Sequence, residues 1–520
     1  MTLVSPGPRM AERLVRPSLG ELWTFLAVAL PALGALVAPM SAVDLASQLR
    51  AGAAILGGQG IPTTDAWTFT VAGATWHDQQ WLAQAFLAAV FSAGGWAGLS
   101  ILRAALVALA FGLLLAAIRT RAPSLSSRSA ALLVIAAFIV AAPALALRPQ
   151  LIAIVLFAAT LLVLSGRRTH PQRLLLIPVL AALWANVHGS FPLVILLAGL
   201  AWLEDLSEGG LPLDLNPRRH VALGAAVAAA IATLLNAAGL AVWTYAIGLA
   251  TDPIMAARVS EWRAPSPATP TGLLFYASVM AVIVFLAVRY ARREVGRWRP
   301  AWPVAILIGR APWPATLTLF LFAILGMAAG RGVAWWPLVA AATVAGMLET
   351  RTAAGQPAPD PTPPAERRSR LNALIAVVLV LAGLALLPVW RPVGAAGAPI
   401  GLLTEAPQGI AAELASGRVP GTNVWNPQLW GSWLELTAPS VKVATDSRIE
   451  LFPPELWDQA DQVASASGSW SAILDRHGVD IVVTAAKPET PLDAAVSGNP
   501  GWTLAYQDEE GSIWARSARP

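Results

Sequence analysis

A series of apolar stretches, separated by short arginine-bearing segments, constrains this chain more than any other feature. A membrane-spanning helix needs about 20 mostly apolar residues. About eleven stretches approach this length, at residues 22–40, 99–118, 130–147, 151–164, 174–187, 191–203, 221–235, 273–289, 315–329, 333–348 and 371–389. Of the 520 residues, 56% are hydrophobic and 12% are charged, about half the charge of a soluble protein. The sequence therefore predicts a mainly α-helical, polytopic membrane bundle.

The arginines predict the orientation of this bundle. Loops on the cytoplasmic side of a membrane are enriched in arginine and lysine. With a cytoplasmic N-terminus and alternating spans, roughly four arginines fall inside for each one outside. The outside ones before the tail are Arg50, Arg148, Arg258, Arg263 and Arg331. We therefore expect a protein of the cytoplasmic membrane, with its N-terminus on the cytoplasmic side and its C-terminus on the outer side. Despite the net charge of +5, we expect no nucleic-acid partner.

Two further apolar segments, at 81–91 and 238–250, are too short to cross a bilayer. The second contains Trp243 and Tyr245, which are residue types that favour the interface. Both segments are predicted to lie in the outer interface, which keeps the number of spans odd.

The chain divides by composition into two parts. Residues 1–390 are predicted to form the transmembrane domain, with a first outer loop at 41–98 and a cytoplasmic linker at 350–370 that is proline-rich at 356–364. From about residue 391, strand-like runs at 441–445, 480–484, 502–506 and 512–515 alternate with helical stretches at 409–416 and 470–477. This alternation predicts a small extracytoplasmic α/β domain at 391–520.

Polar residues in the first outer loop are candidates for chemistry. Asp44 and Gln48 are four residues apart, which puts them on one face of a helix. A carboxylate there can act as a general base or bind a cation, but Asp44 also fits a helix N-cap. Asp65 is typical of a turn or cap. His77 and Asp78 fit an acid/base pair or a hydrated loop.

More polar residues fall at the outer ends of predicted spans. These are Arg148, Gln150, Asn186, His188, Glu261 and Arg331. Arginines in such positions can bind phosphate or extend to the interface. In the tail, Asp446 and Arg448 are predicted to form a surface ion pair of little energetic value.

This layout resembles the glycosyltransferase C superfamily, which includes protein O-mannosyltransferases, oligosaccharyltransferases and lipid A aminoarabinose transferases. More closely, it resembles a large group of bacterial membrane proteins with the same layout. The matching stretches include 44–52 (DLASQLRAG), 60–70 (GIPTTDAWTFT), 184–189 (WANVHG), 423–434 (NVWNPQLWGSWL) and 445–448 (TDSR). The closer group usually has an aromatic pair and a histidine where this chain has Ala46, Ser47 and Gln48.

The resemblance implies transfer of a sugar from a polyprenyl-phosphate donor at the outer membrane face, to an envelope glycan, lipid or protein. It implies that Asp44 deprotonates or orients the acceptor, with inversion at the sugar. The expected substrate-binding and phosphate-binding residues are Arg50, Asp65, His77, Asp78, Arg148, Gln150, Asn186, His188, Glu261 and Arg331. A divalent metal, Mg²⁺ or Mn²⁺, is left open.

Two alternatives also stay open at this point. One is a non-enzymatic membrane protein, either a lipid or glycan transporter or a degenerate transferase that acts as a scaffold. The other is an outer-face glycan polymerase or ligase, which would use similar residues.

Overall fold

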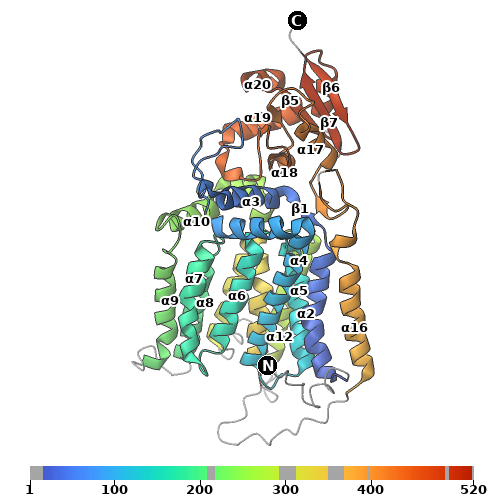
Figure 1. Cartoon of the computed structure of the whole chain (residues 1–520). Helices are drawn as coiled ribbons and strands as arrows, with labels where there is room; N and C mark the ends of the chain where they lie inside the picture. Colours follow the sequence, from blue (N-terminus) through green and yellow to red (C-terminus); the bar gives the residue numbers. More distant parts are fainter. Residues whose placement is uncertain are drawn as a thin grey trace, which may run out of the picture.

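Helices dominate the architecture, and most of them run side by side in one bundle (Figure 1). The computed structural model describes residues 16–207, 217–291, 312–349, 368–395, 397–486 and 491–517. The bundle contains α2 (Leu19–Val37), the later part of α4 (Trp81–Arg121), α5 (Ser127–Ala141), α6 (Pro149–Ser165), α7 (Leu176–Ala185), α8 (Pro192–Ser207), α9 (Val221–Ala232), α12 (Pro270–Ala291), α14 (Trp313–Ala328), α15 (Trp336–Leu348) and α16 (Arg370–Ala385). Each stretch predicted to span a membrane overlaps one of these helices.

Five segments of the described chain are long and apolar enough to cross a membrane. They are Leu19–Val37, Trp81–Arg121, Ser127–Ala144, Pro270–Arg289 and Gly330–Leu348. Other bundle helices are apolar but shorter. The chain is therefore a multi-pass membrane protein, and the number of about eleven spans stays a prediction.

The end of the bundle that carries the sheet also carries helices of a different orientation. Gly95 has a φ of 56° and divides α4 into two parts. The part before Gly95 lies across the end of the bundle, with α3 (Ala42–Ala54) beside it, and α10 (Ala241–Thr251) lies at this same end (Figure 1). The segments predicted as interfacial, 81–91 and 238–250, are thus found together here.

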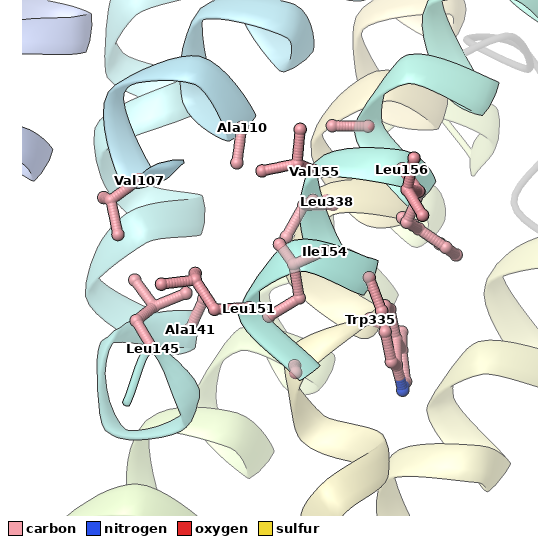
Figure 2. Close-up of a cluster of buried hydrophobic side chains, with 14 of the residues drawn as sticks. Val107, Ala110, Ala141, Leu145, Leu151, Ile154, Val155, Leu156, Trp335 and Leu338 are labelled. Carbon is pink, nitrogen blue, oxygen red and sulfur yellow. The ribbon is translucent and has the colours of Figure 1, made fainter. Parts of the chain in front are cut away.

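Helix α6 occupies the centre of the bundle. Its residues Leu151, Ile154 and Phe157 are completely buried, as expected of a helix that is apolar on every side. Figure 2 shows Leu151, Ile154 and Val155 of α6 near Ala110 of α4 and Leu338 of α15. Because Pro149 and Gln150 begin this buried helix, the residues at its N-terminal end are held firmly in place.

The C-terminal part is built on a five-stranded sheet in the order β4-β3-β5-β7-β6. Strands β3 (Asn423–Trp425), β4 (Lys442–Val443) and β5 (Ile481–Ala485) are parallel, whereas β7 (Gly511–Arg516) is antiparallel to both β5 and β6 (Trp502–Gln507). The four predicted strand-like runs correspond to β4, β5, β6 and β7.

Helices cover both faces of this sheet. Val424 and Val483 pack with the core that includes α17 (Gln408–Ala415) and α18 (Gly431–Thr437). Trp425 and Val482, one residue away from these, pack instead with α19 (Pro454–Ala464), α20 (Trp470–Arg476) and α21 (Pro491–Ser497). The alternation of side chains along a strand thus builds two cores.

A short pair of strands connects the bundle to the C-terminal part. The short strand β1 (Met40–Ser41), which follows α2, pairs in parallel with β2 (Leu403–Thr404) from the C-terminal part. The predicted proline-rich linker at 356–364 lies outside the described residues.

Gly52 allows α3 to approach the first part of α4. A Cβ atom at this position would lie 2.1 Å from the carbonyl oxygen of Gln84, so Gly52→Ala forces two backbones apart. We expect the substitution to destabilise the fold by about 1–3 kcal/mol, measured as a lower apparent Tm in detergent. Gly57→Ala is the matched control because its Cβ would meet nothing within 4 Å. Equal Tm values for the two variants would contradict this packing.

Candidate functional site

A polar cavity lies at the sheet-bearing end of the bundle. Its walls come from the N-terminal end of α6, from α3, from the loop that follows α3, and from residues 447–450 of the C-terminal part. Its volume of about 100 Å³ accommodates several water molecules. The predicted site residues that line it are Asp44, His77, Asp78, Arg148, Gln150, His188 and Arg331.

Asp44 sits in the first turn of α3 but does not cap this helix. Ser41 is the N-cap, and its hydroxyl accepts a hydrogen bond from the Val43 amide. The Asp44 carboxylate is therefore free for another partner, and its Oδ2 lies 2.9 Å from Nη1 of Arg148. Gln48, one turn later, lines the same cavity, as the spacing of four predicted.

Arg148 connects two carboxylates. Its Nη1 and Nη2 lie 3.0 Å and 2.6 Å from the two carboxylate oxygens of Glu261, in addition to the contact with Asp44. Burial alone would lower the pKa of Arg148, but the two carboxylates outweigh it and raise the pKa. Likewise, burial favours a higher pKa for Glu261, but hydrogen bonding to Arg148 brings that pKa below its usual value. Both groups are therefore charged at neutral pH.

Arg331 is the second guanidinium of this site. Its Nε lies 3.3 Å from Glu261 Oε2, and its guanidinium lies 4.9 Å from the centre of the Trp262 ring. Gln150 donates a hydrogen bond to the Arg331 carbonyl oxygen at 3.4 Å. The site thus holds two carboxylates and two guanidiniums, with 18% to 38% of each side chain exposed. We call Asp44, Arg148, Glu261 and Arg331 the open cluster.

His188 faces the cavity as a neutral imidazole. Desolvation, and then the positive charges of Arg331 and Arg148, lower its pKa to about 3. The Ser190 amide donates to Nδ1 at 3.1 Å, so the ring proton is on Nε2. His188 therefore offers one N–H donor to the cavity.

Asp78 is a buried carboxylate that also lines the cavity. Its Oδ1 accepts a hydrogen bond from Gln84 Nε2 at 2.7 Å, whereas Oδ2 is buried and has no partner among the described residues. Desolvation raises the pKa of Asp78 to about 7. Its neighbour His77 contacts the Tyr245 ring, with 5.9 Å between ring centres.

A second group of charges is buried beside the cavity and contains one of its lining residues, Arg448. Arg448, 5% exposed, contacts Asp446 and also Asp65, the latter at 2.6 Å. Its guanidinium stacks on Trp67 and Trp76, at 4.5 Å and 4.8 Å from their ring centres. The prediction that Asp446 and Arg448 form a surface pair is therefore wrong, because both side chains are buried.

Glu435 completes this second group, and its Oε1 lies 3.7 Å from Arg448. Burial raises the pKa of Glu435 well above its usual value, and neither of its carboxylate oxygens has a hydrogen-bond partner among the described residues. Burial therefore favours the protonated form of Glu435. We call Asp65, Glu435, Asp446 and Arg448 the buried cluster.

Four predicted site residues lie away from the cavity lining. One is Glu261, which contacts Arg148 and Arg331 of the lining. Asp65 belongs to the buried cluster, and Arg50 lies next to it, donating to the carbonyl oxygen of Glu435 and stacking on Trp67 at 5.1 Å. Asn186 accepts a hydrogen bond from Trp81 at 2.8 Å and donates to the Leu235 carbonyl, so it joins helix ends beside a neighbouring pocket.

Some lining residues were not among the predicted site residues. Glu450 and Tyr245 face each other at 3.5 Å, and Ser447 contacts Ser47 at 3.1 Å. Gln48 Oε1 is buried and has no partner among the described residues. Of these residues, only Gln48 was indicated by local sequence, through its spacing of four from Asp44.

The surroundings of Asp44 do not fit a divalent metal ion. Its nearest charged partner is a guanidinium, which would repel a cation. Among the described residues, no group of three or more histidine, aspartate or glutamate side chains is placed to hold a metal. The mechanism proposed below therefore has no metal step.

No protein-family model matches the chain, and no curated protein sequence matches it. Solved structures do match. The apo oligosaccharyltransferase of Archaeoglobus fulgidus superposes with a TM-score of 0.53 at 11% identity, over 95% of this chain and 74% of that chain. This chain has a glycosyltransferase C-like fold. The resemblance inferred from sequence is thereby confirmed at the level of the fold.

Two further structures are similar. AglB from Archaeoglobus fulgidus, in complex with an inhibitory peptide and a dolichol-phosphate, has a TM-score of 0.52 at 12% identity, over 95% of this chain and 74% of that chain. ArnT from Cupriavidus metallidurans in the apo state has a TM-score of 0.47 at 13% identity, over 94% of this chain and 97% of that chain.

The buried cluster predicts a strong effect of Arg448→Met. The substitution leaves Asp65 and Asp446 buried without their counter-ion, which costs about 3–5 kcal/mol. Arg476→Met, at the exposed end of α20, is the control and should leave the apparent Tm unchanged. Similar Tm values for the two variants in detergent would contradict the structural role of Arg448.

Asp78 predicts a pH-dependent stability. Its pKa is about 7 in the folded chain against an ordinary 3.8, so the folded state binds more protons between these values. Stability from this group is therefore lost as the pH rises through about 7. Asp78→Asn removes the titration, so its apparent Tm should rise relative to wild type across this window. Parallel pH profiles of the two proteins would be inconsistent with the raised pKa.

Proposed function

We propose that this protein transfers a sugar from a polyprenyl-phosphate donor to an acceptor at the outer face of the cytoplasmic membrane. The observation that carries the proposal is the open cluster. Asp44, Arg148 and Arg331 line a cavity at the end of an apolar bundle, and Glu261 contacts both arginines there. A lipid-linked donor can enter such a cavity from the bilayer, and it carries no nucleotide. The dolichol-phosphate in the similar AglB structure supports a lipid phosphate as the ligand.

The arginines suit the leaving group. When the bond between the sugar C1 and the phosphate oxygen breaks, the electron pair stays on that oxygen, and the lipid phosphate gains one negative charge. Arg148 and Arg331 stabilise this charge more strongly in the transition state than in the bound donor. The Nε2–H of His188 is a third donor, and because its pKa is about 3, its protonation state is constant at physiological pH.

Asp44 is the proposed general base. The acceptor hydroxyl attacks C1 from the face opposite the phosphate, and its proton passes to the Asp44 carboxylate. A donor phosphate that takes Arg148 Nη1 from Asp44 leaves the carboxylate free to accept this proton. Glu261, which holds both terminal nitrogens of Arg148, keeps the guanidinium oriented during this exchange. Glu261 is thus a positioning residue.

Gln48 fits the acceptor. Its unpartnered Oε1 lies in the same cavity as Asp44 and can accept a hydrogen bond from a second hydroxyl of the acceptor. A buried carbonyl oxygen without a hydrogen-bond partner destabilises the fold. A hydroxyl of the acceptor would supply the missing hydrogen bond. This favours a glycan acceptor over a lipid tail.

Transfer by the purified protein tests the proposal. With radiolabelled polyprenyl-phosphate hexose and a crude envelope acceptor, Asp44→Asn should lower kcat by about 10²–10⁴-fold, the typical contribution of a general base. Asp458→Asn, an exposed carboxylate of α19 outside the cavity, is the matched control and should transfer as wild type does.

The outcomes separate the candidate functions. Equal transfer by wild type and Asp44→Asn would exclude Asp44 as the base. No transfer by wild type with any of several hexose and pentose donors would overturn the enzyme assignment in favour of a scaffold or transporter.

A further inference from the structure

The C-terminal part contains a larger pocket that the proposed reaction does not use. Its volume is about 330 Å³, within the range of small-molecule sites. Two tryptophans, Trp425 and Trp457, line it, together with the neutral polar residues Asn426, Gln428, Thr445 and Thr484. An apolar, aromatic wall with a few polar groups is the usual composition of a ligand site.

The position of this pocket follows from the sheet. Asn426 and Gln428 come just after β3, Thr445 just after β4, and Thr484 near the end of β5. These three strands are parallel, so their carboxyl ends meet at one edge. The chain leaves β3 through α18 on one face and leaves β4 through α19 on the other. In sheets with helices on both faces, the crevice at such an edge is where ligands bind.

Trp457 supplies a donor that the protein does not use. It is 5% exposed, and its Nε1 is buried without a hydrogen-bond partner among the described residues. Gln428 donates through Nε2 to the Asp446 carbonyl at 2.9 Å, which leaves its side-chain oxygen as an acceptor. Both groups belong to residues that line the pocket, beside its aromatic rings.

The charges at the pocket argue against an anionic ligand. Arg258, the cation of the lining, has two nitrogens at 2.7 Å from the two carboxylate oxygens of Asp461. Its guanidinium also lies 5.4 Å from the centre of the Trp457 ring. Since this arginine is already paired, the remaining groups suit a neutral ligand that combines hydroxyls with a flat apolar face.

We propose that this pocket binds a neutral hexopyranose unit of the acceptor glycan. The C–H face of a pyranose packs on aromatic rings, and its hydroxyls match the Trp457 N–H and the Gln428 carbonyl. Residues 445–450 form a wall shared with the reaction cavity: Thr445 and Ile449 line the sugar pocket, and Ser447 and Glu450 line the cavity. That the bound sugar belongs to the acceptor rests on the proposed function, whereas binding itself does not.

Blocking the pocket tests the proposal. Ala464, the last residue of α19, is exposed and lines the pocket, so Ala464→Phe fills it without disturbing a core. Gln462→Phe adds the same ring to an exposed residue of α19 outside the lining. With full-length protein in detergent and a panel of neutral hexoses and their disaccharides, calorimetry should show binding to wild type and Gln462→Phe. Ala464→Phe should weaken it by about tenfold or more.

A second variant tests the unused donor. Trp457→Phe keeps an aromatic ring and removes the N–H, so sugar affinity should fall; because the smaller ring leaves a cavity in a core, the apparent Tm should also fall modestly. No binding of any sugar by wild type, or undiminished binding by Ala464→Phe, would overturn the proposal. Asp44→Asn should bind the sugar as wild type does. Binding in this variant without transfer therefore separates the pocket from the reaction, and a failure of one does not imply a failure of the other.

Discussion

The sheet-bearing end of this molecule depends on one buried cation. Arg448 is 5% exposed and contacts Asp65, which lies 383 positions earlier in the chain. A buried guanidinium without such partners would cost several kcal/mol, so the first outer loop and the C-terminal part must fold together. Trp67 and Trp76 cover the guanidinium on the loop side. This contact fixes residues 445–450, of which Ser447, Arg448 and Glu450 line the reaction cavity.

The buried and open clusters contain the same residue types but differ in their exposure to solvent. We infer different roles for the two clusters from this difference. The carboxylates around Arg448 are completely covered, so their contacts are permanent. The side chains of Asp44 and Glu261 are 33% and 38% exposed, so a phosphate can reach Arg148 and take the place of Asp44 while Glu261 keeps its contacts. The proposed mechanism therefore places reactivity in the open cluster and leaves rigidity to the buried one.

Local sequence was enough to predict some of this arrangement. Runs of apolar residues predicted the bundle helices, and strand-like runs such as 480–484 predicted strands of the sheet. The spacing of four residues predicted that Asp44 and Gln48 lie on one face of a helix, and both line the cavity. Contacts between distant segments left no such signal. The pairing of Met40 with Leu403 and the burial of Arg448 both depend on how the tail docks on the bundle, and Asp446 beside Arg448 fits a surface pair equally well by sequence.

Direct observation of a lipid phosphate would test the central claim, which is that the open cluster binds the leaving group. The measurement is a cryo-electron microscopy map of the protein in nanodiscs with polyprenyl phosphate. The account predicts phosphate density within hydrogen-bond distance of Arg148, Arg331 and His188, with the Arg148 to Asp44 contact lengthened from 2.9 Å. A phosphate bound elsewhere on the protein, with the open cluster unchanged, would contradict it.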